Sequence, residues 1–355
     1  MPSFSACALR TIVASAVLTT LSGVTADAAE SRTRMVPCHD NAALISAVNE
    51  ANAAGSGVIR LARKCTYVLS RAFPGDYGDN ALPAITGDIT IEGNGATLAR
   101  ANTAPDMRIL QVSGHGALTV ENTTLTNGKL DPSFSFGGNA FVFVPTASLK
   151  LVHSRLTHGF ARWGGGVLND GPLEIDHSQI TRNSTSYGGG GIWNRWTLLV
   201  KASEITANTG TVEIGGIATG GSTPGPTATA TVRSSRVSDN RGSGIATDVR
   251  MTTDVIDSVV TGNTGTAAVP GGGVDNEGTT TLMRSQVVGN HSPSTGGGIY
   301  NVGTLRLVRT SVARNTAGTD GGGIYNAIPG TVTLRHSAVY GNRPNNCAPP
   351  GTCPR

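Results

Sequence analysis

The chain has 355 residues, of which 48 are glycine and only 14% are charged, and its formal net charge is +4. The low charge excludes a disordered polyelectrolyte, and the lack of a G-X-Y period excludes collagen. Thr, Ser, Val and Gly dominate, and the first three favour a pleated sheet over a helical bundle. No run or stripe of Lys and Arg along the sequence indicates nucleic acid binding.

The first 29 residues match a secretory signal. Arg10 supplies a positive start, and residues 12–24 form an apolar stretch that is too short to span a bilayer. Small residues at 26–29 suit a cleavage site, although an anchor or a buried helix is the alternative. No other stretch is apolar enough to cross a membrane. The sequence therefore predicts a secreted, extracellular protein whose mature chain has no transmembrane segment.

Residues 30–81 are expected to form an N-terminal cap over the end of whatever structure follows. Within them, Asp40 can N-cap a short helix. The apolar face of that helix would carry Leu44, Ile45 and Val48.

Four cysteines remain once the signal is removed, and an even number in an exported chain predicts disulfides. Of the three connectivities, the local one is favoured, which pairs Cys38 with Cys65 and Cys347 with Cys353. The second bridge would close a tail over residues 344–355, whose prolines cannot continue a strand. No Cys-x-x-Cys motif occurs, and no metal site is predicted from the cysteines.

The main signal is internal repetition. A phrase of three glycines, a branched residue, a variable residue and Asn recurs at 164–169, 189–194, 271–276, 296–301 and 321–326. With its degenerate copies, its branched residue is spaced by 25, 25, 28, 29, 25 and 25 positions. A second phrase, Ser/Thr-x-Val/Ile-x-x-Asn, runs in step with the first.

The period predicts a solenoid over residues 82–343, in about ten turns of roughly 26 residues. Each turn carries three short strand signals, with glycines and asparagines at the corners. Stacking the turns every ~4.8 Å gives parallel sheets around one core. The Asn of the second phrase is expected to form a hydrogen-bonded ladder between turns. Its members are Asn183, Asn208, Asn240, Asn263, Asn290, Asn315 and Asn342.

These two phrases resemble the right-handed parallel β-helix repeats of the pectin-lyase-like superfamily. They are most similar to polymorphic outer-membrane-protein repeats, and residues 43–52 resemble the N-terminal cap segment of secreted bacterial members. The resemblance implies an all-β, single-stranded right-handed parallel β-helix of about ten coils with a short N-terminal capping helix. It does not imply one function, because the superfamily holds lyases, hydrolases, adhesins and phage tailspikes.

Catalytic motifs are sparse. Glycoside hydrolysis requires a pair of carboxylates, and this chain lacks the Asn-Thr-Asp and Asp-Asp motifs that polygalacturonate hydrolases share. Lyase-like members of the superfamily place acids for Ca²⁺ near a basic residue, and the closest candidates are Asp170, Glu174 and Asp176 with Arg182. A solvated outer face explains the same residues. Ca²⁺ is therefore expected only if the chain is a lyase, and no other cofactor or metal is predicted.

Aromatic residues concentrate between residues 134 and 196, beside an insertion at 129–145 where the repeat lapses. Ring faces match the apolar faces of sugars, and arginines can pair with uronates or sulfates. The candidate ligand-binding residues are Trp163, Tyr187, Trp193, Trp196, Arg162 and Arg195. The alternative is that these rings only pack the insertion onto the solenoid.

We therefore expect a secreted, non-catalytic, adhesin-like surface protein that binds an extracellular polysaccharide or cell-surface glycan as a monomer, without a nucleic acid partner. Two alternatives stay open. One is a polysaccharide lyase or glycoside hydrolase acting on acidic, uronate-containing polymers, and the other is an extracellular scaffold. The sequence favours a protein that is not an enzyme but does not decide the question.

Overall fold

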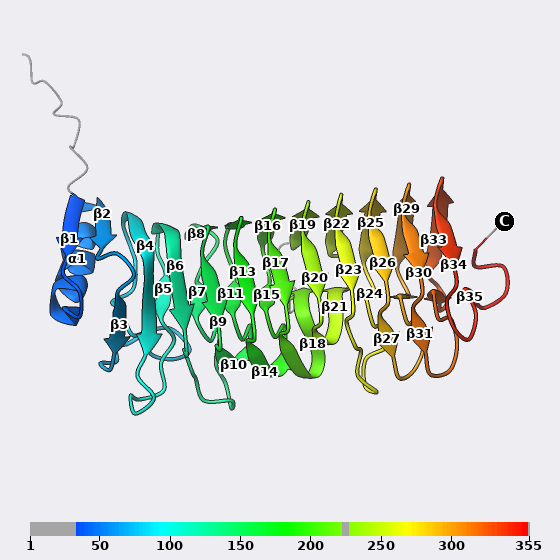
Figure 1. Ribbon diagram of the computed structural model, residues 1–355, viewed down its shortest axis with the longest axis horizontal. Coiled ribbons are helices and arrows are strands. Elements are labelled where there is room, and N and C mark those ends of the chain that lie inside the picture. The colour runs from blue at the N-terminus through cyan, green and yellow to red at the C-terminus, as the bar shows by residue number, and fades with distance from the viewer. Residues whose placement is uncertain (1–32, 222–226, 354–355) are drawn as a thin grey trace, which may run out of the picture. The chain divides into compact units, whose positions relative to one another are not determined.

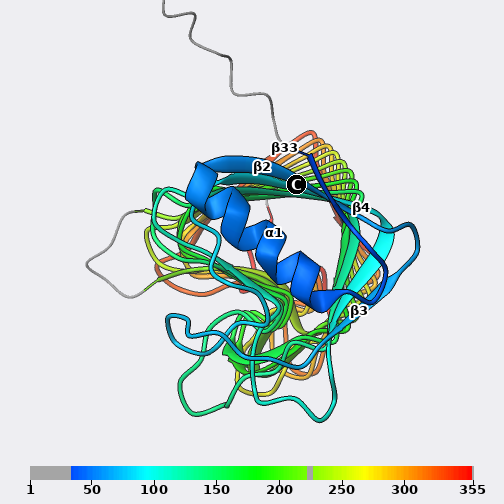
Figure 2. The same ribbon diagram turned by 90° about the vertical axis from the view of Figure 1, so that its left-hand side faces the viewer.

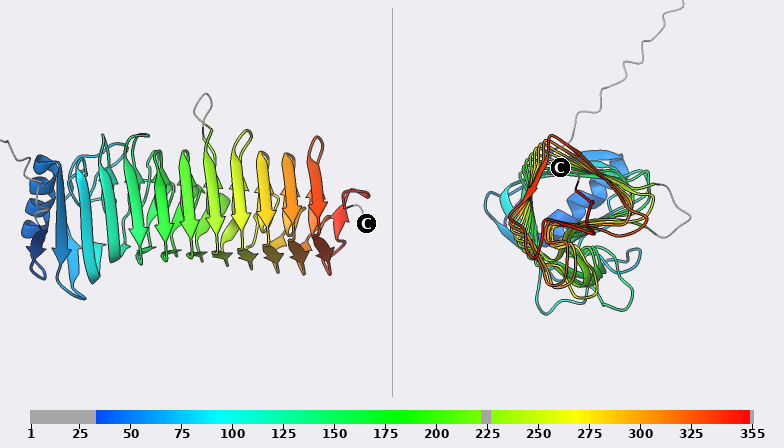
Figure 3. Two further views of the ribbon diagram at one scale, coloured as in Figure 1. Left: turned by 90° about the horizontal axis from the view of Figure 1, so that it is seen from above. Right: turned by 90° about the vertical axis from the view of Figure 1, so that its right-hand side faces the viewer.

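The computed structural model describes residues 33–221 and 227–353, so the predicted signal at 1–29 lies outside the described residues. The described chain is an all-β parallel solenoid of about 11 turns. Its coils succeed one another along one axis, and their strands lie side by side (Figure 1). Figure 3 shows that the outlines of successive coils superimpose when they are seen along that axis. This is a right-handed parallel β-helix, as the repeat predicts.

A sheet of 21 strands, here called the large sheet, follows two sides of every coil. Its N-terminal strands are β1 (Thr33–Val36), β2 (Ser56–Leu61), β3 (Thr66–Leu69), β4 (Asp88–Arg100) and β6 (Ala117–Thr126). Its first arm continues as β8 (Ser148–Val152), β12 (Leu173–Asp176), β16 (Thr197–Lys201), β19 (Thr229–Arg233), β22 (Thr252–Ile256), β25 (Thr279–Met283), β29 (Thr304–Val308) and β33 (Thr331–Arg335). Its second arm continues as β9 (Arg155–Thr157), β13 (Gln179–Thr181), β17 (Glu204–Thr206), β20 (Arg236–Ser238), β23 (Val259–Thr261), β26 (Gln286–Val288), β30 (Ser311–Ala313) and β34 (Ala338–Tyr340).

A sheet of 12 strands, here called the second sheet, forms the remaining side. Its main path is β5 (Leu110–Val112), β7 (Ala140–Val142), β11 (Val167–Asn169), β15 (Ile192–Asn194), β18 (Thr209–Thr219), β21 (Arg241–Thr247), β24 (Val274–Asn276), β28 (Ile299–Asn301), β32 (Ile324–Asn326) and β35 (Cys347–Ala348). Two short strands, β10 (Phe160–Trp163) and β14 (Ser184–Gly188), extend it beside β18, and β27 (His291–Ser292) pairs separately with β31 (Thr316–Ala317).

The parallel pairing extends beyond the predicted solenoid limits of 82–343 at both ends. At the start, β1 pairs with β2, and β2 pairs with β4. At the end, β35 pairs with β32 through Cys347, so the tail adds a strand between Pro344 and Pro349. The segments expected as cap and tail therefore contribute strands to the same sheets.

The helix α1 (Asn41–Ala54) lies across the N-terminal end of the coils (Figure 2). The Asp40 carboxylate accepts a hydrogen bond from the Ala43 N–H at 2.8 Å, which begins the helix as predicted. Leu44 and Val48 are fully buried against the first coil. The helix thus covers an apolar end that would otherwise expose an unpaired sheet edge. Among the described residues, no helix has the length and apolarity to cross a bilayer.

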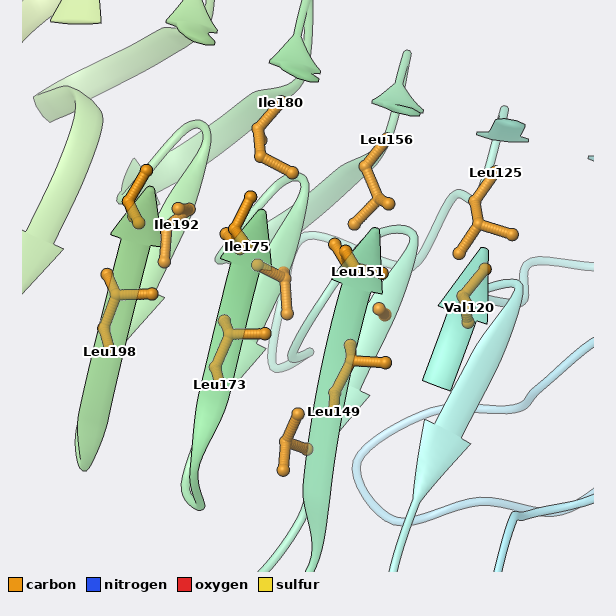
Figure 4. Packing of buried hydrophobic residues seen from close by; sticks show 14 of the residues in the cluster. Val120, Leu125, Leu149, Leu151, Leu156, Leu173, Ile175, Ile180, Ile192 and Leu198 are labelled. Carbon is orange, nitrogen blue, oxygen red and sulfur yellow. The ribbon is translucent and has the colours of Figure 1, made fainter. Parts of the chain in front are cut away.

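The core is built from columns of identical or similar side chains, one from each coil (Figure 4). Leu149, Leu173 and Leu198 occupy one column, because the register pairs each with the next. All three are at most 3% exposed. Burial of one such side chain stabilises the fold by about 2 kcal/mol.

A ladder of buried asparagines runs parallel to the core columns. The Nδ2 of each asparagine donates to the Oδ1 of the next at 2.8–3.1 Å, and the series is Asn139, Asn183, Asn208, Asn240, Asn263, Asn290, Asn315, Asn342 and Asn346. In most steps the backbone N–H also donates to the next Oδ1, as from Asn183 to Asn208 at 3.0 Å. The ladder therefore satisfies corner groups that have no strand partner.

A second, interrupted ladder holds the strands of the second sheet. Asn169 donates to Asn194 at 2.8 Å, and Asn276 donates to Asn301 at 2.6 Å. These asparagines close the glycine phrase of the repeat. Thr219 and Thr247 take the same register position in the two intervening coils.

Each coil turns at corners where one residue has a left-handed backbone. At the first corner, between the two arms of the large sheet, this residue precedes the repeated Ser or Thr, and the series is His153, His177, Ala202, Ser234, Asp257, Arg284, Arg309 and His336, with φ of 44–52°. At the next corner it precedes the ladder Asn, as Arg182 and Ala207 do at φ 55°. The asparagine side chains thus hydrogen-bond at this corner, whereas the residues that precede them provide the left-handed backbone that turns the chain.

The three glycines of the repeat serve two different purposes, which Gly189, Gly190 and Gly191 illustrate. The first bends the chain at φ 68°. The second and third touch the next coil, because a Cβ on Gly190 would lie 2.6 Å from the Thr209 carbonyl oxygen and one on Gly191 would lie 2.8 Å from that of Gly216. Only glycine allows neighbouring coils to approach this closely.

Both disulfides have the predicted local pairing. Cys38 is bonded to Cys65, and Cys347 is bonded to Cys353. Since the first bridge closes a loop with a sequence separation of 27, it stabilises the N-terminal end by about 3–4 kcal/mol through the unfolded chain.

Substitution Asn240→Ala tests the ladder. It would leave the Ile205 carbonyl and the Asn208 backbone N–H without their present partners. We expect the free energy of unfolding to fall by about 3 kcal/mol, because each buried unsatisfied group costs about 1–3 kcal/mol. Chemical denaturation measures the loss. Gln286→Ala removes an exposed carboxamide and is expected to change stability by less than about 0.5 kcal/mol; equal effects of the two variants would contradict the role of the ladder.

Candidate glycan-binding groove

The outward side of the second sheet presents one side chain per coil in a single column. The register sets this series as Gln111, Phe141, Leu168, Trp193, Ala218, Ala246, Asp275, Tyr300 and Tyr325. Because the strands are parallel and in register, successive members are about 4.8 Å apart. Its aromatic members are Phe141, Trp193, Tyr300 and Tyr325, and the residues between Trp193 and Tyr300 are small or acidic.

An aromatic cluster covers the N-terminal part of this column. Phe134 and Phe136 come from the insertion at 129–145, and their ring centroids lie 5.6 and 5.3 Å from that of Trp163. Tyr77, from the loop after β3, lies 4.6 Å from Phe136. Edge-to-face contacts of this kind stabilise aromatic pairs. The rings pack the insertion onto the solenoid, yet Phe134 stays 58% exposed and Tyr77 46% exposed.

A buried arginine positions the loop that carries Tyr77. Arg108 is fully buried and donates to the backbone carbonyls of Asp76 and Tyr77 at 2.9 and 3.0 Å. It also donates to Gln111 Oε1 at 2.8 Å and lies 5.0 Å from the centre of the Phe141 ring. Burial lowers the pKa of Arg108, although the negative charge of nearby Asp76 acts to raise it. The guanidinium thus holds the loop against the aromatic cluster.

Two adjoining pockets share the rings of Trp163 and Trp193. The first, of about 400 Å³, is lined by Tyr77, Phe134, Phe136, Trp163, Leu168, Trp193 and Arg195. The second, of about 430 Å³, is lined by Trp163, Tyr187, Trp193, Ile214, Gly221, Ala246, Thr247, Asp248, Val269, Asp275 and Glu277. Together they are here called the aromatic groove, which runs along the coil axis over the second sheet.

Of the two arginines predicted to bind anions, Arg195 lines the groove and Arg162 lines neither pocket, and both are engaged by protein groups. Arg195 makes a two-pronged ion pair with Asp170 and lies 5.1 Å from the centre of the Phe136 ring. Arg162 lies 4.4 Å from the centre of the Trp163 ring and donates to the Ser133 carbonyl. Their guanidinium groups therefore brace the aromatic cluster, and the charge of Arg195 is balanced within the protein.

The structure separates Trp196 from the other candidate aromatic residues. Its side chain lines neither pocket, and its backbone carbonyl accepts the N–H of Thr229 at 2.8 Å. Trp163, Tyr187 and Trp193 are the three that it brings together.

Sequence reasoning missed three acids that line the second pocket, namely Asp248, Asp275 and Glu277. One signal for Asp275 was present, because this residue occupies the position of Trp193 in the glycine phrase. Asp248 and Glu277 follow strands β21 and β24 in turns. A turn has no side-chain period, so its side-chain directions cannot be read from the repeat.

The predicted catalytic residues do not form one site. Glu174 and Asp176 lie on the large sheet, whereas Asp170 is paired with Arg195 beside the groove. Lys201 Nζ bridges Glu174 at 2.7 Å and Asp176 at 3.1 Å. Arg182 is an exposed corner residue. The ion-pair partners of Glu174 and Asp176 are Lys150, His177 and Lys201 instead.

The electrostatics of Glu174 and Asp176 favour charged carboxylates. The hydrogen bond from Lys201 lowers the pKa of Glu174, and the charge of Lys150 adds to it. Burial acts to raise the pKa of Asp176, but Lys201 and His177 outweigh it and lower that pKa. Neither acid therefore suits the role of a proton donor near neutral pH.

Candidate metal ligands are similarly engaged. Calcium needs six or more oxygen ligands, and the oxygens of Asp170, Glu174 and Asp176 bond protein cations instead. Within residues 33–221 and 227–353, the one group of three His, Cys, Asp or Glu side chains with metal-binding proximity is Cys38, His39 and Cys65. Its two sulfurs are joined in a disulfide, so they offer no thiolate.

No protein-family model and no curated protein matches this chain. Solved structures do resemble it. The Dettilon tailspike protein is 13% identical, with a TM-score of 0.48 over 86% of this chain and 67% of that chain. The Azotobacter vinelandii mannuronan C-5 epimerase AlgE6 A-module is 14% identical, with a TM-score of 0.42 over 88% and 96%. Pectate lyase Pel9A is 16% identical, with a TM-score of 0.36 over 80% and 70%.

These similarities concern the path of the chain and transfer no ligand, activity or residue role to it. The class of this protein, a right-handed parallel β-helix, follows from the register of its own sheets. The finer likeness to polymorphic outer-membrane-protein repeats stays a resemblance between short phrases.

Substitution Lys201→Met tests the electrostatics of the large sheet. We expect the pKa of Glu174 to rise towards its usual value, which a carboxyl ¹³C NMR titration measures. In the parent protein, the lowered pKa of Glu174 stabilises the fold at pH values above the pKa that Glu174 has in the unfolded chain. This stabilisation is lost as the pH falls through the pKa of Glu174 in the folded protein. The variant should therefore lose less stability on acidification. Lys64→Met, which removes an exposed lysine on another coil, should leave the Glu174 titration unchanged.

Proposed function

We propose that this protein is an extracellular glycan-binding solenoid that holds a neutral polysaccharide in the aromatic groove. The observation that carries the proposal is the pair of adjoining pockets that share Trp163 and Trp193 on one face of the solenoid. Sugars present apolar faces that pack on rings and hydroxyls that hydrogen-bond to carboxylates. The groove supplies both kinds of partner along the coil axis.

The charges of the groove favour a neutral chain over an acidic one. Asp248, Asp275 and Glu277 line the second pocket, where they would repel carboxylates or sulfates. Arg195, the cation that lines the first pocket, is paired with Asp170. Neutral hydroxyl groups are therefore the partners that this lining accepts.

Export and binding without cleavage are part of the same proposal. The disulfides and the signal-like segment at 1–29 support an oxidising, extracellular location. The ion pairs of Asp170, Glu174 and Asp176 support a protein that binds rather than cuts, because these acids are held by cations.

Alanine substitution of the two shared rings tests the proposal. With immobilised galactomannan, xylan and soluble β-glucan as probes, we expect Trp163→Ala and Trp193→Ala each to weaken binding about tenfold, since one aromatic contact is worth about 1 kcal/mol or more. Trp196→Ala is the matched control and should bind as the parent does. If all three variants bind as tightly as the parent, the proposed binding in the aromatic groove is wrong. It is also wrong if the parent binds none of the neutral probes.

One observation favours a second candidate function, which is hydrolysis in the same groove. Three carboxylates line one pocket there, and glycoside hydrolysis needs a pair of them. If this candidate holds, the binding mixtures should accumulate new reducing ends. Asp275→Asn and Glu277→Gln should then stop the release while binding persists. If no probe releases new reducing ends, hydrolysis is excluded for these polysaccharides and binding is the function that remains.

A further inference from the structure

The C-terminal part of the chain is strongly basic, although the whole protein carries a formal charge of only +4. Residues 278–353 contain six arginines and a single acid, Asp320. The arginines are Arg284, Arg306, Arg309, Arg314, Arg335 and Arg343. No basic stripe is visible in the sequence, because most members are separated by many residues. Their spacing nevertheless follows the coil period.

The fold gathers four of these residues at one edge, here called the arginine row, which consists of Arg284, Arg306, Arg309 and Arg335. Arg284 and Arg309 occupy the first corner on successive coils. Their backbone N–H groups donate to the next coil, from Arg284 to Val308 at 2.9 Å and from Arg309 to Arg335 at 2.8 Å. Neighbouring coils lie about 4.8 Å apart, so the row spans a short, continuous strip.

The remaining members of the row face outward beside that corner. Arg306 lies in β29 opposite Thr333 of β33, and Arg335 ends β33 opposite Val308. All four arginines are exposed. The row therefore presents several guanidinium groups to the same side of the molecule.

Most of this charge is not balanced within the described part of the protein. Arg284 pairs with Asp257 through two contacts of 2.6 and 2.8 Å. Across residues 33–221 and 227–353, no ion pair is recorded for Arg306, Arg309 or Arg335. Like charges held this close repel one another, and a bound polyanion would relieve the repulsion.

Hydroxyl groups flank one arginine of the row, Arg306. Thr281, Arg306 and Thr333 form one outward column on β25, β29 and β33, because the register pairs each with the next. Guanidinium groups pair with carboxylates or sulfates in a planar, two-pronged way. Threonine hydroxyls can bond the sugar hydroxyls between those anions.

We propose that the arginine row binds an anionic polysaccharide, with carboxylate or sulfate groups, laid along the coil axis. This site is separate from the aromatic groove and does not depend on the function proposed for it. A polysaccharide is favoured over a nucleic acid because threonines, rather than base-stacking rings, flank Arg306 on both neighbouring strands of its column. The two disulfides also fit the extracellular medium in which such polymers occur.

The test compares the full chain with the triple variant R306Q/R309Q/R335Q. The probes are immobilised polygalacturonate for carboxylates and dextran sulfate for sulfates. We expect the variant to bind at least one of them about tenfold more weakly than the parent, because it lacks three exposed charge contacts of the row. Parent binding should also weaken as salt is raised. With fully methyl-esterified polygalacturonate, which lacks the charges, the parent and the triple variant should not differ in binding.

Matched controls separate charge at the row from total charge and from folding. R250Q removes one exposed arginine in a turn at another edge and should bind as the parent does. The double variant R306Q/R309Q should show an intermediate loss, and thermal unfolding should be unchanged in every variant. Trp163→Ala should retain binding to polygalacturonate. The experiment therefore tests the arginine row separately from the function proposed for the aromatic groove.

Two outcomes would overturn the proposal. One is equal affinity of the parent and the triple variant for both anionic polysaccharides. The other is tighter binding of the parent to double- or single-stranded DNA of similar charge than to either polysaccharide, which would identify the row as a nucleic acid surface.

Discussion

The rest of the structure depends on the hydrogen bond between asparagine side chains of neighbouring coils. A coil rises by only about one strand spacing, so a buried polar group at a corner can find its partner in the coil directly above or below. The amide of Asn meets this need, because it donates to one neighbour and accepts from the other, as Asn240 does between Asn208 and Asn263. The ladder thereby fixes the corner at which the chain must turn, and the core columns follow from that register.

The aromatic groove occurs where the repeat is interrupted. The insertion at 129–145 and the loop that carries Tyr77 add rings above the second sheet, and Arg108 ties that loop down from inside. The regular coils below do not need to rearrange for a ligand. Such a rigid support reduces the ordering cost of binding, since the rings are already held in place by one another.

Charge is divided between two faces of the same solenoid. The aromatic groove is lined by acids, with its arginines braced against rings or paired. The arginine row lies on the large sheet and has few acids near it. A low overall charge therefore conceals two surfaces of opposite character, which suit different polymers.

The sequence by itself determined the solenoid, because a period of about 25 residues forces successive copies into contact. It also indicated the capping helix after Asp40 and favoured the local pairing of the cysteines. The glycine phrase also gives Trp193 and Tyr300 the same position in the repeat. Only the tertiary structure decided which residue bends each corner, why Gly190 and Gly191 tolerate no side chain, and how Asp248 and Glu277 reach the groove. It also decided that Arg195 is neutralised by Asp170, whereas Arg309 has no ion pair among the described residues. The reason is physical: a repeat fixes the positions of strand residues, but turn side chains and ion pairs depend on neighbours that the period does not specify.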